Sequence, residues 1–186
     1  MADKICLRQL LDADWRRLVE LGGADGRRPV SAFLHPRFAS VWLFRHAAAA
    51  HFSGFRSLAK VLSFANFALF GCEIPSCLVI GPGLVMPHPN GVILGARSIG
   101  RNATIFQQVT LGAAEVDFHY QADLRPCVGD LVTIGSGARV IGSVRLGDGC
   151  TVGANAVVLE DVPAGALAVG VPARARTVEG TGGGGA

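Results

Sequence analysis

From residue 74 onward, an aliphatic residue recurs at every sixth position through most of the chain. The series shifts by one residue after Met86 and is interrupted between residues 112 and 127. Its members are Ile74, Ile80, Met86, Ile93, Ile99, Ile105, Leu111, Val128, Ile134, Val140, Leu146, Val152 and Val158. A hexapeptide repeat is the sequence signature of a parallel β-helix. We therefore predict a mainly β fold with three short strands and about eighteen residues per coil, each aliphatic residue pointing inward.

Small residues accompany this repeat at two fixed positions. Glycine follows many of the aliphatic residues, at positions 81, 100, 112, 129, 135, 147 and 153. A small or β-branched residue often stands four places after the aliphatic one: Ala103, Val109, Val132, Ala138, Val144, Cys150 and Ala156. Glycine and asparagine suit coil corners, where a positive φ is tolerated. The alternative is a glycine-rich β-sandwich whose periodicity arises by chance. Thirteen aliphatic residues that keep the six-residue spacing across two register shifts argue against it.

The first 71 residues follow a helical pattern instead. Leu7, Leu11, Trp15 and Leu18 are spaced for one helix face, and Gly22 ends that run. Pro36 opens a second predicted helix that stops at Gly54, and residues 55–70 form a third that stops at Gly71. We expect residues 22–35 to be a loop.

These patterns divide the chain into three parts. We predict a helical segment over 1–71, a β-helix over 72–172 with a protruding loop at 112–127, and a tail over 173–186. The tail ends in GTGGGGA, a composition that favours disorder.

Composition excludes several classes of protein. The net charge is +3 without a basic run, which fits a small anionic ligand better than a nucleic-acid partner. The five cysteines include no CxxC pair, so neither a zinc site nor a disulfide framework is indicated, and reduced thiols in the cytoplasm are expected. The N-terminus lacks an apolar signal core, and the apolar stretch 61–72 is about half the ~20 residues of a membrane span.

Two segments resemble the serine acetyltransferase family. They are EIPSCLVIGPGLVMPHPNGVILGARSIGRNATIFQQVTLG (73–112) and IGSGARVIGSVRLGDGCTVGANAVVLEDVPAGALAVGVPARA (134–175). The hexad alone would imply only the broad β-helix acyltransferase class. Four motifs are more specific for the serine acetyltransferase family: the acid before Ile-Pro, the H-x-x-G step, Q-x-VTLG and GVPAR. The resemblance implies a left-handed parallel β-helix, an acetyl-CoA donor, a hydroxyl acceptor and a homotrimer with active sites between subunits.

The resemblance also implies a general base. His88 in MPHPNG matches the family's catalytic histidine, and a neutral imidazole titrates near working pH. An alcohol needs such a base in contact before it attacks a thioester. Glu73 in CEIP matches the acidic partner, whose carboxylate fixes the imidazole tautomer. Glu73 and His88 are close to one coil apart in sequence, so contact between them is expected.

The donor site follows from the same match. Coenzyme A is expected in a groove between two β-helices, where small residues let the pantetheine arm approach the backbone. The matching positions are Gly112, Ala113, Ser136, Gly153, Ala154 and, for a coenzyme phosphate, Arg174. Simple corner geometry explains any single glycine equally well.

The acceptor side departs from the family pattern. Pro87 stands where an aspartate usually holds the ammonium group of serine, and Leu124–Arg125 replace a basic residue and a second histidine. An unpaired buried charge is costly, so this favours a sugar or glycan precursor over free serine, which is the alternative. Candidate acceptor contacts lie in the loop: Asp117, His119, Tyr120 and Arg125.

Three other readings compete. An acyl-cysteine route through Cys127 or Cys150 lacks a recognisable histidine partner. A zinc hydratase would need three histidines, and only His88 and His119 follow residue 51, so we expect no metal. A non-catalytic scaffold is the last, and it would tolerate loss of His88.

Overall fold

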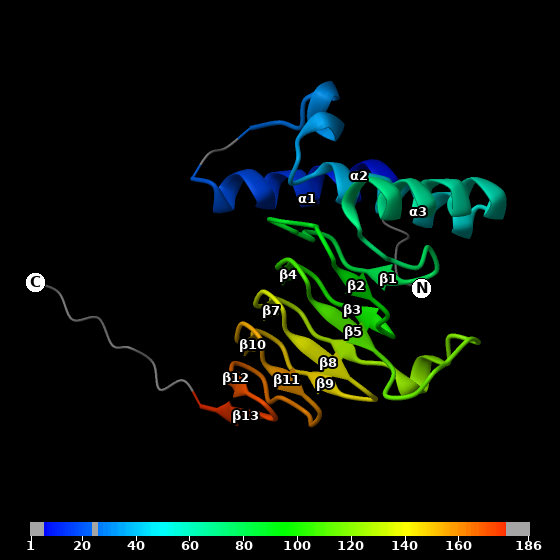
Figure 1. The fold of residues 1–186 in the computed structure, drawn as a ribbon. Coiled ribbons are helices and arrows are strands. Elements are labelled where there is room, and N and C mark those ends of the chain that lie inside the picture. Colours follow the sequence, from blue (N-terminus) through cyan, green and yellow to red (C-terminus); the bar gives the residue numbers. More distant parts are fainter. Residues whose placement is uncertain (1–5, 24–25, 178–186) are drawn as a thin grey trace, which may run out of the picture.

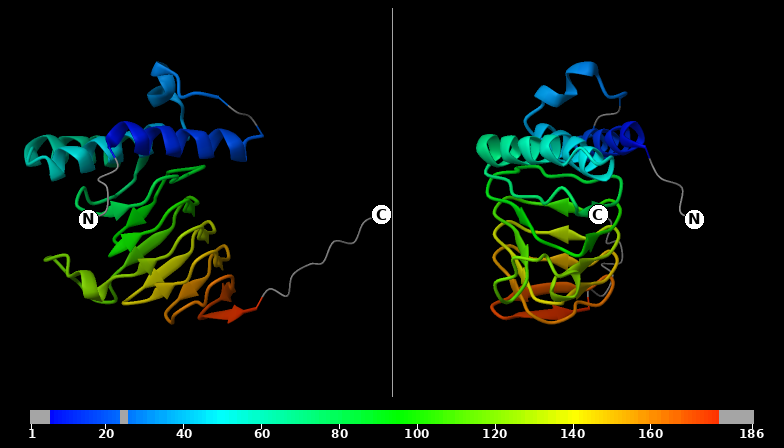
Figure 2. Two further views of the ribbon diagram at one scale, coloured as in Figure 1. Left: turned by 180° about the vertical axis from the view of Figure 1, so that it is seen from behind. Right: turned by 90° about the vertical axis from the view of Figure 1, so that its right-hand side faces the viewer.

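The computed structural model describes residues 6–23 and 26–177, which form a layer of helices across one end of a parallel β-helix (Figures 1 and 2). The helical elements are α1 (Leu7–Leu21), the short 3-10 helix η1 (Val30–Leu34), α2 (Ala39–Phe52) and α3 (Arg56–Phe70). Short strands separated by turns follow in the rest of the described chain, which confirms the predicted left-handed β-helix with an N-terminal helical segment.

The helix ends follow local chemistry. Gly22 caps α1, and Gly71 ends α3 in the left-handed conformation at φ 58°, as the sequence predicts. The prediction of a plain loop over 22–35 was wrong in part, because η1 forms there after Pro29. α2 begins at Ala39 and not at Pro36, because Phe38 is its N-cap residue.

Thirteen short strands build the β-helix. They are β1 (Val79–Ile80), β2 (Ile93–Leu94), β3 (Ser98–Ile99), β4 (Thr104–Ile105), β5 (Thr110–Gly112), β6 (Cys127–Val128), β7 (Thr133–Ile134), β8 (Arg139–Ile141), β9 (Arg145–Leu146), β10 (Thr151–Val152), β11 (Val157–Val158), β12 (Leu167–Gly170) and β13 (Ala173–Arg176). Three sheets result. Sheet 1 is β1-β3-β6-β9, sheet 2 is β4-β7-β10-β12-β13, and sheet 3 is β2-β5-β8-β11.

The strand register gives the coil length. Cys127 pairs with Arg145, and Thr133 pairs with Thr151, each eighteen residues further along the chain. The loop between β5 and β6 lengthens one coil and protrudes from the β-helix, as predicted, and it contains the short 3-10 helix η2 (Ala122–Leu124) (Figure 1). β13 was not predicted. It pairs antiparallel with β12 inside the expected tail, whose glycine-rich end lies outside the described residues.

The core is a stack of the predicted aliphatic residues, with one exception. Ile105, Leu111 and Ile134 are fully buried, and the small residues four places after each aliphatic are also buried. The predicted inward position of Ile93 was wrong: it is 39% exposed, whereas Leu94 is fully buried. The turn before β2 takes one residue more than the sequence indicated, and a shift of one residue reverses the face of a strand.

Apart from Gly112, the glycines that follow the aliphatic residues serve a purpose other than the predicted one. A Cβ on Gly81 would lie 2.7 Å from the backbone of Gly100, and one on Gly135 would lie 2.7 Å from the nitrogen of Ala154. Neither glycine has a positive φ. They are needed because neighbouring coils approach too closely for a side chain. Asn102 and Asn155 do take left-handed corner conformations, as expected.

A buried ion pair fastens the helices to the β-helix. The Arg45 guanidinium of α2 donates to both carboxylate oxygens of Asp14 in α1, at 2.7 and 3.0 Å. It also donates to the carbonyls of Ile80 and Gly81, at 2.7 and 2.6 Å. The backbone nitrogens of Gly83 and Leu84 donate to Asp14, each at 2.8 Å. The helical layer therefore closes the open end of the coil stack with polar contacts as well as apolar ones.

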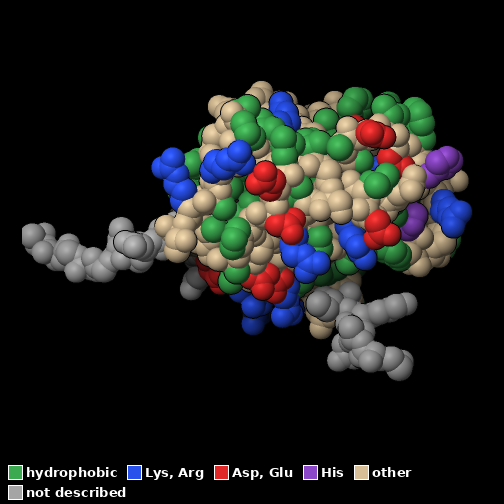
Figure 3. Space-filling view, turned by 90° about the horizontal axis from the view of Figure 1, so that it is seen from below, with side chains coloured by type: hydrophobic (Ala, Val, Ile, Leu, Met, Phe, Trp, Pro, Cys, Tyr) green, Lys and Arg blue, Asp and Glu red, His purple; other side chains and the backbone are tan. Residues whose placement is uncertain are grey.

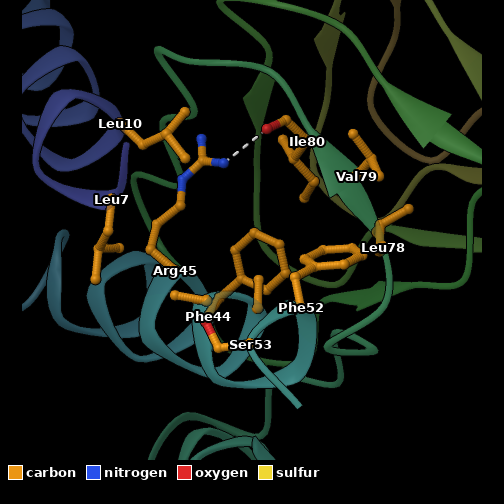
Figure 4. Close-up of a pocket in the computed structure, with 11 residues that line it drawn as sticks. Leu7, Leu10, Phe44, Arg45, Phe52, Ser53, Leu78, Val79 and Ile80 are labelled. Atoms are coloured by element: carbon orange, nitrogen blue, oxygen red, sulfur yellow. Dashed lines mark hydrogen bonds between the residues drawn. The ribbon is translucent and has the colours of Figure 1, made fainter. Parts of the chain in front are cut away.

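A cavity of about 580 Å³ lies beside this junction (Figure 4). Its walls come from α1, α2 and β1, including Leu7, Phe44, Phe52 and Val79. Its one charged lining group is Arg45, which is already paired with Asp14, and Ser53 contributes its one hydroxyl group.

Charge on the opposite end of the molecule is mixed. Viewed from below, basic and acidic side chains alternate over the described surface and form no single basic patch on that face (Figure 3). No helix within 6–23 and 26–177 has the length and apolarity needed to cross a bilayer.

Candidate active site

His88 lies on the edge where sheet 2 turns into sheet 3, and this edge is continuous from coil to coil. The Gln108 nitrogen donates to the Asn90 carbonyl at 3.0 Å, and the Gly137 nitrogen donates to the Gln107 carbonyl at 2.9 Å. The Asn155 nitrogen continues the series to Ser136 at 2.8 Å. We call the stacked turns 87–91, 106–108, 135–137 and 153–155 the His88 edge. His88 itself is exposed, so a substrate can reach its ring.

Glu73 lies one coil from the strand that follows His88. Its backbone pairs with Ile93, and its nitrogen donates to the Val92 carbonyl at 2.8 Å. Its side chain is exposed. No hydrogen bond joins the Glu73 and His88 side chains in the described part of the chain. The two residues are thus on neighbouring coils, as predicted, and their direct contact stays a prediction.

The predicted donor residues fall into three places. Ser136, Gly153 and Ala154 lie on the His88 edge, two and three coils along from His88. Gly112 ends β5 at the far side of sheet 3, and no atom lies within 4 Å of a Cβ built on it, so open space adjoins its backbone. Ala113 follows it into the loop.

Arg174 lies in β13 at the last coil, where it pairs with Val169. Its guanidinium is exposed and forms an ion pair with Glu160 at 3.3 Å. The residues on the His88 edge therefore lead toward a basic residue at the coil end. That course suits a long anionic donor such as coenzyme A.

Three of the four predicted acceptor contacts bind one another. Arg125 donates to Asp117 at 2.8 Å, and their side chains are 10% and 2% exposed. The Arg125 guanidinium also stacks 3.8 Å from the centre of the Tyr120 ring and donates to the Gly95 carbonyl at 3.2 Å. The Tyr120 hydroxyl donates to the Ala96 carbonyl at 2.7 Å.

This cluster holds the loop against the turn between β2 and β3. Burial alone would raise the pKa of Asp117, but the Arg125 guanidinium and the backbone N–H groups of Gln121 and His119 outweigh it and lower that pKa. Burial raises the pKa of Tyr120 to about 12. His119 is the one predicted acceptor contact whose residue is exposed, and it joins this network through its backbone N–H, which donates to Asp117 at 3.0 Å.

Other chemistry has little support in the structure. Burial, followed by the nearby Asp148 charge, raises the pKa of Cys150 to about 11, which leaves its thiol a poor nucleophile at neutral pH. Within 6–23 and 26–177 no three His, Cys, Asp or Glu side chains are arranged to hold a metal ion.

Sequence reasoning missed one charged residue on the His88 edge. The Arg139 guanidinium donates to the Gln108 carbonyl at 2.6 Å and to the Gly137 carbonyl at 3.0 Å. The hexad pattern predicts that Arg139 points outward, but it predicts the same of Arg145. Only the structure shows that Arg139 is the one that reaches the His88 edge. The Gln107 side-chain oxygen is buried nearby without a hydrogen-bond partner.

Comparisons with known proteins identify the family of the chain. The family model for bacterial transferase hexapeptide (six repeats) matches residues 128–160. The chain is 38% identical over 146 residues to a serine acetyltransferase of Helicobacter pylori, covering 78% of this chain and 82% of the relative. It is 37% identical to a serine acetyltransferase of Mycobacterium tuberculosis, covering 75% of this chain and 60% of the relative.

Solved structures give the same result. Neisseria gonorrhoeae serine acetyltransferase in complex with serine superposes with a TM-score of 0.78 at 30% identity, covering 90% of this chain and 68% of that chain. A serine acetyltransferase in complex with CoA superposes with a TM-score of 0.77 at 27% identity, covering 91% of this chain and 69% of that one. The chain therefore belongs to the serine acetyltransferase family of hexapeptide-repeat transferases, and it is an acetyl-CoA-dependent acetyltransferase.

Proposed function

We propose that this chain transfers the acetyl group of acetyl-CoA to the hydroxyl of L-serine. The observation that carries the proposal is the match over 90% of the chain to a serine acetyltransferase solved with serine bound. The curated relatives described above, at 37–38% identity, carry the same name. The serine alternative of the sequence analysis thus has more support than the sugar acceptor that the sequence analysis preferred.

The loop weakens the case for a sugar. That expectation depended on Asp117, Tyr120 and Arg125 as contacts for sugar hydroxyls. Their polar groups already bond to one another and to backbone carbonyls, so binding a sugar would first break those bonds. Pro87 still leaves the ammonium group of serine without the usual aspartate, and this remains the main argument for another acceptor.

In the proposed reaction, His88 takes the proton of the acceptor hydroxyl as its oxygen attacks the acetyl carbonyl carbon of the donor thioester. The carbon–sulfur bond breaks, and the imidazolium returns the proton to the departing sulfur, so an ester and a free thiol form. Glu73 accepts a hydrogen bond from the other ring nitrogen and stabilises the imidazolium. In the present geometry this requires a side-chain rotation, for which two exposed side chains have room.

We further infer that the working enzyme is a homotrimer with sites between subunits. The His88 edge and the Gly112–Ala113 corner lie on opposite borders of sheet 3. At about 3.3 Å per residue and roughly five residues across, they are about 16 Å apart. One chain supplies the two halves on separate edges, and a neighbouring copy can bring its own loop corner to the His88 edge.

Coenzyme A release with L-serine, and separately with hexoses and nucleotide-activated sugars, tests the acceptor. We expect turnover with serine and none above background with sugars; the reverse pattern would overturn the serine proposal.

His88→Ala tests the base. We expect kcat with serine to fall by roughly 10²–10⁴ while the acetyl-CoA KM changes little. Partial recovery with added imidazole would show that a missing base, and not a folding defect, causes the loss. His35→Gln, at an exposed histidine near the helices, is the matched control and should retain full activity. A His88→Ala enzyme with the parent rate would disprove the assignment.

A further inference from the structure

Arg139 combines a fixed position with an unpaired charge. Its two hydrogen bonds reach carbonyls on adjacent coils, those of Gln108 and Gly137, which hold the guanidinium against the His88 edge. Carbonyl groups are neutral, so they orient the guanidinium without cancelling its charge. No ion pair involves Arg139 among the residues that the structure describes.

The other arginine near the site has no such freedom. Arg125 lies in the loop where the sequence analysis expected an acceptor contact, but Asp117 neutralises it and both side chains are nearly buried. Separating a buried pair of this kind is unfavourable, since it leaves an uncompensated charge. Of these two arginines, Arg139 is the one without an ion pair among the described residues, so its charge is available to a bound anion.

We propose that Arg139 binds the carboxylate of the acceptor amino acid and so selects it over uncharged alcohols. This inference rests on the proposed serine function and names the residue that recognises the zwitterion. A guanidinium offers a fork of N–H donors that fits a carboxylate, and such charge-assisted bonds are about twice as strong as neutral ones.

The spacing suits a small hydroxy amino acid. Adjacent coils are about 4.8 Å apart. The Arg139 guanidinium contacts the 106–108 turn, which stacks next to the His88 turn. The guanidinium is therefore roughly one to one and a half coil spacings, about 5–7 Å, from the His88 turn. In serine the hydroxyl and carboxylate oxygens are roughly 3–4 Å apart, and hydrogen bonds add about 2.8 Å at each end. Extended, these lengths add to about 9–10 Å, more than the spacing of about 5–7 Å, so a bent serine molecule can reach both His88 and Arg139.

The direction of the side chain favours the acceptor over the donor. Arg139 begins on β8 and reaches toward Gln108, which is one coil closer to His88. Of the residues expected to follow the donor, Gly153 and Ala154 lie one coil further from His88 than β8, and Ser136 lies on the same coil as Arg139.

The test compares L-serine with L-serinamide, which keeps the hydroxyl and ammonium but has no carboxylate. We expect the parent enzyme to prefer serine by about 10–100-fold in kcat/KM, the range for one charge-assisted bond. Arg139→Gln should lose that preference because its kcat/KM for serine falls while its kcat/KM for serinamide does not. Its acetyl-CoA KM should stay within about twofold of the parent value. Arg139→Lys keeps the charge but not the fork, and it should retain part of the preference.

Arg145→Gln is the matched control, since Arg145 is an equally outward arginine on sheet 1. It should behave like the parent enzyme. An Arg139→Gln enzyme that still prefers serine would overturn the role of Arg139 while leaving the serine function intact. A rise in the acetyl-CoA KM without loss of the serine preference would assign Arg139 to the donor and also overturn the inference. A parent enzyme that does not acetylate serine would instead refute the proposed function itself.

Discussion

Replacing Arg45 with methionine would remove the centre of the junction between the helices and the β-helix. The Arg45 and Asp14 side chains are 3% and 0% exposed, so water cannot replace the lost partner. Asp14 would keep only its hydrogen bonds from the Gly83 and Leu84 nitrogens, each 2.8 Å. The carbonyls of Ile80 and Gly81 would also lose the hydrogen bonds that Arg45 donates to them.

The expected loss of unfolding free energy is about 3–5 kcal/mol, the usual result of removing one member of a buried pair. Burial already raises the pKa of Asp14, and losing Arg45 raises it further because a lowering influence disappears. An acid whose pKa is raised by folding stabilises the protein below its unfolded pKa near 3.9, and that contribution is lost as the pH rises through the folded value. The deficit should therefore be smaller at pH 5 than at pH 8.

Urea unfolding followed by tryptophan fluorescence would measure this, since Trp15 and Trp42 both lie in the helical layer. Arg28→Met is the control, because its partner Asp12 is 40% exposed and such pairs contribute about 0–1 kcal/mol. Asp14→Asn combined with Arg45→Met should recover at least about 1 kcal/mol by removing the buried charge. A cost below about 1 kcal/mol for Arg45→Met alone would refute this account of the junction.

Two further predictions concern the β-helix and its loop. Gly135→Ala should lower the free energy of thermal unfolding by about 1–3 kcal/mol, because its Cβ would meet the Ala154 nitrogen at 2.7 Å. Gly112→Ala is the control and should leave stability unchanged, because open space surrounds Gly112. Equal effects of the two substitutions would contradict the close-approach explanation. The lowered pKa of Asp117 means that its bonds to the loop persist above pH 4 and are lost as the pH falls through the folded value. The protection factors of the 113–126 amides against hydrogen exchange should fall there, and Asp117→Asn should show the same fall at pH 7.

The coil stack was predictable because a hexad repeat admits few structures. Inward residues such as Ile105 and Ile134 had to be apolar and evenly spaced, so the pattern determined fold, coil length and loop position together. The pattern failed at Ile93, where a turn of unusual length follows His88. Turn length depends on corner backbone conformation, which an aliphatic repeat does not encode.

Contacts between distant segments were not predictable. Nothing in the sequence pairs Arg45 with Asp14 or Arg125 with Asp117, because long-range ion pairs leave no periodic signal. The role of Arg139 was hidden for the same reason: its two carbonyl partners become neighbours only when the coils stack. Motif matching nevertheless predicts His88 as the base, and its exposed position on a continuous edge is compatible with that proposed role.

The β-helix also separates stability from specificity in a way that bears on the acceptor. Inward side chains stack on their counterparts one coil away, so a change there disturbs several coils. Outward residues on the turns contact few neighbours, and substitutions such as proline at position 87 cost the fold little. Acceptor preference can therefore change through a few edge residues while the donor path and the general base stay in place. Arg139 is held on that edge and is proposed to bind the carboxylate of the acceptor, but as a cation it does not replace the aspartate that pairs with the ammonium group.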